Sequence, residues 1–277
     1  MNTKIGFTTE NPDPEENEKI ENSSDSANTE DEKIVAKKSI VQVAFEGKNT
    51  KLAYLNDKFD LNCGDIVYVE GKFEGKRGRV TDINYNFKIK ASEYKKVIAL
   101  VETHLTGKFY FVGSHLVTFD FQALPKEKAR GWFLPPKNHD DELINFDDKK
   151  YFPLYDLGEM GADNEIGDRA YTYYLENRVR YIELDATHGY AIIEGTKPYE
   201  VEFEYEDGKI SNIVCNCYCA FPCKHQIATM LQLRECLDTV KKTYGDMFEE
   251  RQYFAGIYKT TFFINSLENR TTGCLQL

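Results

Sequence analysis

The stretch CNCYCAFPCKHQIATM, residues 215–230, gathers four of the seven cysteines of a 277-residue chain beside a histidine. Its spacing is Cys215-x-Cys217-x5-Cys223-x-His225, which offers three thiolates and one imidazole. Four such ligands complete the closed tetrahedral shell that zinc adopts in structural sites. An odd number of cysteines also disfavours a full disulfide framework. The spacing therefore predicts one structural zinc ion.

Two kinds of periodicity flank these cysteines. Upstream, RYIELDATHGYAIIEG and YEVEFEYEDGKISNIV alternate apolar and polar residues and contain turn signals at Gly195 and Asp207-Gly208, which is typical of antiparallel strands. Downstream, HQIATMLQLRECLDTV changes to helical spacing. We expect Cys223 and His225 in the first turn of that helix, where free amides and the positive helix end favour thiolates.

This arrangement resembles the SWIM zinc finger, in which strands precede Cys-x-Cys, a variable loop and a Cys-x-His that opens a helix. The likeness covers residues 171–240. It implies a ββα fold around one structural Zn²⁺, and contacts with DNA or with proteins. Cys219 departs from the pattern, because many SWIM fingers carry a residue there that does not bind the metal. The alternative ligand set uses Cys219, in the register Cys217-x-Cys219-x3-Cys223.

Other chemistry fits the cluster less well. The redox motif Cys-x-x-Cys is absent, as are the His-x-Glu and His-Glu-x-x-His elements of catalytic zinc sites. A hydrolase with Cys223 as nucleophile and His225 as base would leave the other cysteines without a role. The chain also lacks a Gly-x4-Gly-Lys-Ser/Thr phosphate loop. We expect a protein that is not an enzyme, and the sequence identifies no small-molecule substrate.

Residues 39–103 form short alternating runs separated by glycines, which predicts a small β-barrel. Within them GDIVYVEGKFEGKRGRVTDI, residues 64–83, resembles the KOW motif of SH3-like barrels, with a turn about one residue shorter than the usual pattern. Barrels of this type commonly use the basic turn to contact RNA or protein. The predicted fold class is α+β: an SH3-like barrel and a ββα SWIM domain.

Cations gather in this barrel segment, although the chain as a whole has 35 Lys and Arg against 46 Asp and Glu. Such a balance gives no global attraction to phosphate, so nucleic acid would need a local patch. An alternative is that the lysines are only the solvated face of the barrel, and the protein is then purely a protein-interaction adaptor. The candidate nucleic-acid residues are Lys72, Lys76, Arg77, Arg79, Lys88 and Lys90.

The roles of the remaining segments are interpreted from their amino-acid composition. Residues 1–38 are acidic and poor in large apolar side chains, which predicts a disordered tail that serves as a solubilising leader or as a docking segment. Residues 104–170 are interpreted as a connecting region. Residues 241–277 are interpreted as strands that the sequence does not assign to either domain. The acidic SWIM region disfavours phosphate contact and favours a protein partner. The absence of an apolar leader or spanning segment predicts a cytoplasmic protein without membrane contact.

Overall fold

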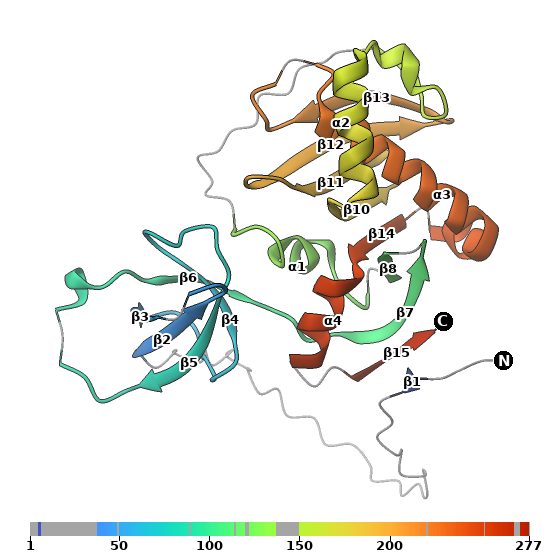
Figure 1. Ribbon diagram of the computed structural model, residues 1–277. Helices are drawn as coiled ribbons and strands as arrows, with labels where there is room; N and C mark the ends of the chain where they lie inside the picture. The colour runs from blue at the N-terminus through green and yellow to red at the C-terminus, as the bar shows by residue number, and fades with distance from the viewer. Residues whose placement is uncertain are drawn as a thin grey trace, which may run out of the picture. The chain divides into compact units, whose positions relative to one another are not determined.

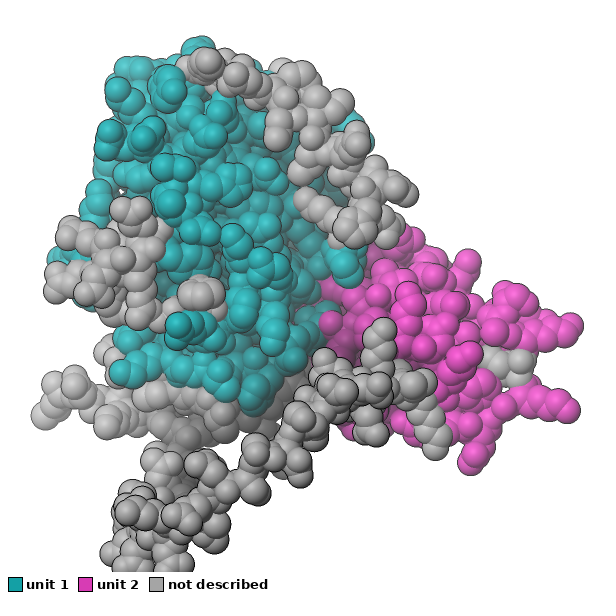
Figure 2. Space-filling model, turned by 180° about the vertical axis from the view of Figure 1, so that it is seen from behind, with its two compact units in different colours: residues 1–6, 101–277 teal, residues 7–100 magenta. Residues whose placement is uncertain are grey.

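The computed structural model describes residues 5–6, 38–48, 50–88, 90–113, 115–119, 122–136, 150–219, 221–251, 253–268 and 272–276. The chain is mixed α+β and divides into two compact units, residues 7–100 and residues 1–6 with 101–277, which Figure 2 colours separately. Each unit contains one largely antiparallel sheet. Apart from β1 and Lys38, the predicted acidic tail lies outside the described residues.

The smaller unit is a five-stranded sheet in the order β3-β2-β5-β4-β6. The strands are β2 (Ser39–Phe45), β3 (Lys51–Asn56), β4 (Ile66–Val69), β5 (Gly78–Asn84) and β6 (Val97–Val101), and η1 (Ala91–Glu93) is a short 3-10 helix. The two edges of this sheet approach each other, because a single bridge joins Leu55 to Lys96 and the Leu55 amide donates to the Lys95 carbonyl at 2.9 Å. The sheet is therefore curved, but the described strands do not close it into the predicted barrel.

Alternation on β2 builds the core of the smaller unit. Val41, Val43 and Phe45 point inward, and Phe45 stacks on Phe73 with ring centroids 4.3 Å apart. Gly78 faces them at close range: a Cβ atom there would lie 2.3 Å from the Cγ1 atom of Val43. Only glycine permits this approach of β5 to β2.

The larger unit contains a ten-stranded sheet in the order β1-β15-β7-β8-β14-β10-β11-β12-β13-β9. Only the pair β15 and β7 is parallel among the described strand pairs of this sheet. The bounds are β1 (Ile5–Gly6), β7 (Thr106–Val112), β8 (Leu116–Phe119), β9 (Phe152–Pro153), β10 (Val179–Asp185), β11 (His188–Glu194), β12 (Pro198–Glu206), β13 (Lys209–Cys215), β14 (Tyr253–Tyr258) and β15 (Thr272–Gln276).

Two helices cover one face of this sheet. Figure 1 shows α2 (Asn164–Leu175) and α3 (Lys224–Arg251), which is kinked at Tyr244, packed over β10 to β13. Every second residue of β12, such as Val201 and Phe203, points into this apolar layer, together with Met230 and Leu233 of α3. The shorter helices are α1 (Lys126–Gly131), η2 (Leu157–Met160) and α4 (Lys259–Glu268).

The opposite face of β10 carries a buried charge. Glu183 is 1% exposed and contacts the guanidinium of Arg130 on α1 and the hydroxyl of Tyr181. The Arg130 guanidinium also lies 3.9 Å from the ring centre of Tyr190. A buried carboxylate needs such compensation, so α1 is held to the sheet by electrostatics as well as by packing.

The structure changes two of the expected segments. Residues 104–170 are more than a connection, since they supply β7, β8, β9 and α2 to the larger unit. The C-terminal segment was expected to be strands, which is wrong for Lys259–Glu268: these residues form α4, between β14 and β15. β14 lies between β8 and β10, so the C-terminal segment belongs to the larger unit. None of the described helices combines the length and apolar character that crossing a membrane requires.

Candidate metal centre

The hairpin of β12 and β13 and the start of α3 bring the predicted ligands together. Asp207 and Gly208 form the hairpin turn, both with positive φ, as the Asp-Gly dipeptide predicts. Cys215 is the last residue of β13, and Cys217 follows two residues later. Cys223 directly precedes α3, and His225 is the second residue of that helix. The predicted strand-to-helix junction is therefore confirmed.

The ligand atoms of Cys215, Cys217, Cys223 and His225 all lie within 4.8 Å of one another. The Nδ1 atom of His225 is 3.7 Å from the Cys215 sulfur and 3.9 Å from the Cys223 sulfur. In a tetrahedral zinc site, the usual metal–ligand distances place sulfur and nitrogen ligands about 3.6 Å apart. These four residues therefore fit a tetrahedral metal ion, and Nδ1 is the imidazole atom that would bind it.

Charge balance favours a cation among the three thiols. The contact between the Cys215 and Cys223 thiols lowers the pKa of Cys223 well below its ordinary value and raises the pKa of Cys215 well above it. Burial raises the pKa of Cys217 to about 11. Protein groups alone thus support one thiolate, because two more anions in contact with it would repel it. A divalent cation would let all three ionise.

Two aromatic rings hold the imidazole of His225. Tyr199 of β12 stacks on it with centroids 4.2 Å apart and an interplanar angle of 20°. Tyr173 of α2 meets it edge-on at 5.5 Å. The Nε2 atom of His225 is buried and has no hydrogen-bond partner among the described residues, so packing of these rings helps to fix the orientation of the ligand. Sequence reasoning did not identify either tyrosine, because neither is close to the cluster in the chain.

Gln226 is a supporting residue that the sequence could have indicated. Its Oε1 atom accepts from the Cys223 amide at 2.8 Å, and its Nε2 atom donates to the Ile213 carbonyl at 3.1 Å. The first contact is the return bond of a capping box, in which a Glu or Gln three residues into a helix reaches back to the capping residue. The pattern Cys223-x-x-Gln226 carries this signal. Gln226 thereby ties the start of α3 to β13.

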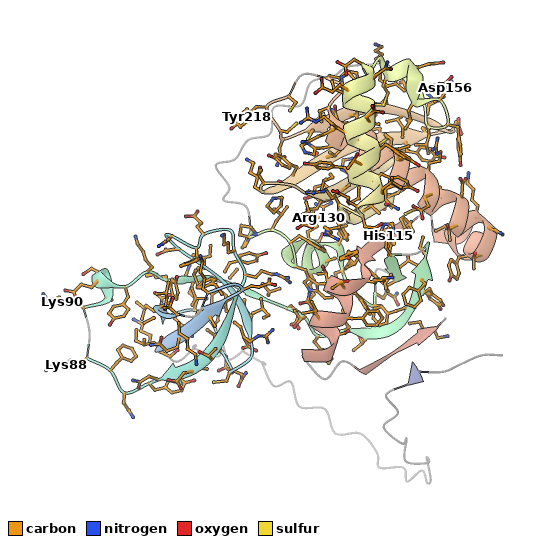
Figure 3. The ribbon with its side chains drawn as sticks, viewed as in Figure 1. Lys88, Lys90, His115, Arg130, Asp156 and Tyr218 are labelled. Atoms are coloured by element: carbon orange, nitrogen blue, oxygen red, sulfur yellow. The ribbon has the colours of Figure 1, made fainter. Side chains whose placement is uncertain are left out.

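Cys219 lies outside the set of converging ligand atoms and is exposed. In Figure 3, Tyr218, between Cys217 and Cys219, extends away from the sheet, and its side chain is fully exposed. The alternative register with Cys219 therefore has no support in the geometry of the four converging residues.

The candidate nucleic-acid residues fall into separate groups. Lys72, Lys76 and Arg77 lie on the turn between β4 and β5, whereas Lys88 and Lys90 follow the other end of β5, where Figure 3 shows them pointing outward. Seven residues of strand separate the groups, which corresponds to roughly 20 Å.

Individual contacts further divide the candidate cations. Arg79 is half-buried on β5 and donates from Nη1 to the Gly64 carbonyl at 2.9 Å. The Nζ atom of Lys90 lies 3.7 Å from a carboxylate oxygen of Glu93. Among the candidates, Lys72 and Lys76 are exposed and share one turn with the half-buried Arg77. The structure therefore brings three of the six together.

Comparison of the chain with protein-family models, with curated proteins and with solved structures gives no match.

Proposed function

We propose that the protein is a non-enzymatic binding protein whose larger unit is folded around one structural zinc ion in the manner of a SWIM finger. The convergence of Cys215, Cys217, Cys223 and His225 within 4.8 Å carries this proposal. Zinc is the metal of choice for three thiolates and an imidazole. The order of strands, Cys-x-Cys, loop and Cys-x-His before a helix supports the resemblance to SWIM fingers.

A structural rather than catalytic role follows from the number of ligands. Four protein ligands complete the tetrahedral shell, whereas a catalytic zinc ion keeps a position open for water or substrate. A Cys223 nucleophile activated by His225 is disfavoured, because the Nδ1 atom of His225 faces the Cys215 sulfur as closely as the Cys223 sulfur. The two residues therefore belong to one shared cluster rather than to a separate pair.

The partner that we propose for the larger unit is a protein. Near the metal centre, Tyr218 is fully exposed and Phe221 is 45% exposed. Exposed aromatic side chains are enriched at protein interfaces. On the face of β12 that α2 and α3 do not cover, Glu200, Glu202 and Glu204 succeed one another, which disfavours a phosphate backbone there.

Zinc content and partner capture test this function. The full chain should bind one equivalent of zinc and, when immobilised, retain a protein from a cell extract. The same chain carrying Tyr218→Ala should keep its zinc and lose that protein. A wild-type chain without stoichiometric zinc contradicts the metal assignment, and a retained protein that does not respond to Tyr218→Ala contradicts a partner surface at the metal end.

Nucleic-acid binding by the smaller unit is a second candidate, favoured by the shared turn of Lys72, Lys76 and Arg77. It accords with the resemblance to the KOW motif. Fluorescence anisotropy with labelled DNA and RNA over a salt series tests it, because each phosphate contact contributes a slope of about −0.9 in log K against log salt for duplex DNA. Alanine at these three positions should reduce the slope. The variant Lys88→Ala/Lys90→Ala is the matched control at the other end of β5. No binding at low salt would exclude this candidate.

A further inference from the structure

The outer edge of β13 is only partly covered in the larger unit. β9 pairs with Lys209 and Ile210, and no described strand pairs with residues 211–215 on that side. One carbonyl of this stretch, that of Ile213, accepts from a side chain of α3 rather than from a strand. An edge of this kind presents backbone groups that can pair with another extended segment.

A pocket of about 350 Å³ follows this edge. Four consecutive residues of β13, Asn212 to Cys215, line it. Neighbouring residues of a strand point to opposite faces, so a pocket lined by consecutive residues runs along the backbone edge and not over one face. Phe152 of β9 and Phe221 also line it, as does Lys150, which precedes β9 by two residues. We call this pocket the β13 groove.

The walls of the β13 groove combine apolar side chains with one cation. The rings of Phe152 and Phe221 lie 5.7 Å apart, and Val214 is 37% exposed. Lys150 is the only lysine, arginine, aspartate or glutamate among the lining residues, and its Nζ atom lies 5.1 Å from the ring centre of Phe152. These walls complement an apolar side chain with an acidic side chain close to it.

Building on the protein-binding role proposed above, we propose that the β13 groove binds an extended segment of a partner protein, which pairs with β13 as an added strand. The segment carries an aliphatic or aromatic residue that lies against Phe152 and Phe221, and a nearby Asp or Glu that faces Lys150. Backbone pairing provides affinity in this mode of recognition, and the side-chain contacts provide specificity.

The test uses the zinc-loaded full chain and a library of random dodecapeptides displayed on phage. Selected peptides are synthesised with a fluorophore, and their affinities are measured by anisotropy. We expect peptides with an apolar and an acidic residue, and a loss of affinity of at least about tenfold with Phe221→Ala, since an aromatic contact is removed. Lys150→Glu should reverse the preference from acidic to basic peptides.

Two controls separate this mode of binding from others. Alternate backbone N–H groups of an extended peptide point to opposite edges. Two versions of each peptide are therefore made, one methylated on the odd-numbered nitrogens and one on the even-numbered nitrogens. The version that loses the donors facing β13 should bind at least about tenfold more weakly than the other. Tyr171→Ala removes a 54% exposed aromatic side chain of α2 and should leave peptide binding unchanged. Zinc content and the fluorescence of Trp132 verify that each variant is folded.

The outcomes that overturn the inference differ from those that overturn the proposed function. Peptides that bind equally to wild type and Phe221→Ala, or that tolerate methylation of either set of nitrogens, exclude the β13 groove but leave a partner surface elsewhere on the unit. Failure to select any peptide also overturns the inference. A wild-type dimer that becomes monomeric with Phe221→Ala would assign the groove to a second copy of the chain. Loss of stoichiometric zinc from the wild type would instead refute the proposed function.

Discussion

Replacing Cys223 by serine should unfold the larger unit and leave the smaller unit folded. Cys223 is 3% exposed and joins the end of β13 to the start of α3 through the metal centre. Serine conserves the shape of the side chain but is a poor zinc ligand, so the substitution removes one of the four ligands with little change in packing. The smaller unit has its own core and contains none of the four ligands.

The magnitude follows from the coupling of metal binding to folding. Structural zinc contributes about 10–16 kcal/mol of apparent binding free energy in small zinc domains, and this is folding free energy. A typical domain is stable by only about 5–15 kcal/mol. α3 carries Ile227, Met230, Leu233 and Leu237 of the apolar layer, so release of its first turn weakens the packing of the core as well. The free energy of unfolding of the larger unit should therefore fall to near zero or below.

The single tryptophan makes the assay specific. Trp132 lies in the larger unit, is fully buried and donates from Nε1 to the Glu102 carbonyl at 2.8 Å. Its emission should shift to longer wavelength in Cys223→Ser, with loss of zinc by elemental analysis, and a chelator should produce the same shift in wild type. Cys219→Ser is the matched control and should change neither. Stoichiometric zinc with a native emission spectrum in Cys223→Ser would refute the ligand assignment, and zinc loss in Cys219→Ser would support the alternative register.

Three further perturbations test the packing of the two units. Arg130→Met should lower the free energy of unfolding by about 3 kcal/mol or more, because it leaves Glu183 buried without its cation; adding Glu183→Gln should restore most of the loss in urea titrations followed by tryptophan fluorescence. Burial lowers the pKa of His115 below its ordinary 6.5, so the unfolded chain binds that proton first. The stabilisation by neutral His115 is therefore complete above about pH 6.5 and is lost as the pH falls below that value through the lower pKa of the folded state. His115→Gln cannot titrate there, so its urea midpoint should fall less than that of wild type between pH 7.5 and 5.5, and equal shifts would contradict this assignment. Gly78→Ala should lower the calorimetric melting temperature of the smaller unit, because the new methyl group would lie 2.3 Å from Val43 and such overpacking costs about 1–3 kcal/mol.

Local pattern predicted the strands around the metal centre and the helix after it, and failed where tertiary packing decided the structure. The segment KTTFFINSLE has the β-branched and aromatic residues of a strand but forms α4. In this helix, the ring centroid of Phe262 lies 4.9 Å from that of Phe109 and 6.5 Å from that of Trp132. β propensity reflects surroundings more than the backbone, so contacts distant in sequence can override it. α2 was missed although Asp163 caps it, with its carboxylate accepting from the Ile166 amide at 2.7 Å.

The candidate site was predictable only where its members are close in sequence. Spacing alone identified Cys215, Cys217, Cys223 and His225, since a short loop brings two ligand pairs together whatever the rest of the fold. Spacing could not show that Tyr199 and Tyr173 enclose the imidazole, because they come from separate elements. The list of basic residues likewise could not show that β5 separates them into two groups.

The metal centre and the β13 groove share a structural connection through one amide side chain. The side chain of Gln226 accepts a hydrogen bond from the Cys223 amide and donates one to the Ile213 carbonyl. The residue that caps α3 therefore also fixes the strand along which the groove runs. Cys215 belongs to both features, because it ends β13, lines the groove and lies among the four ligand atoms. A metal ion held by the four residues would order Cys215 and the start of α3 together, and the edge that would pair with a partner segment lies between them. A structural zinc ion at this site would therefore have a direct route to the proposed binding edge: with the metal bound, β13 would be held in the extended form that an added strand requires.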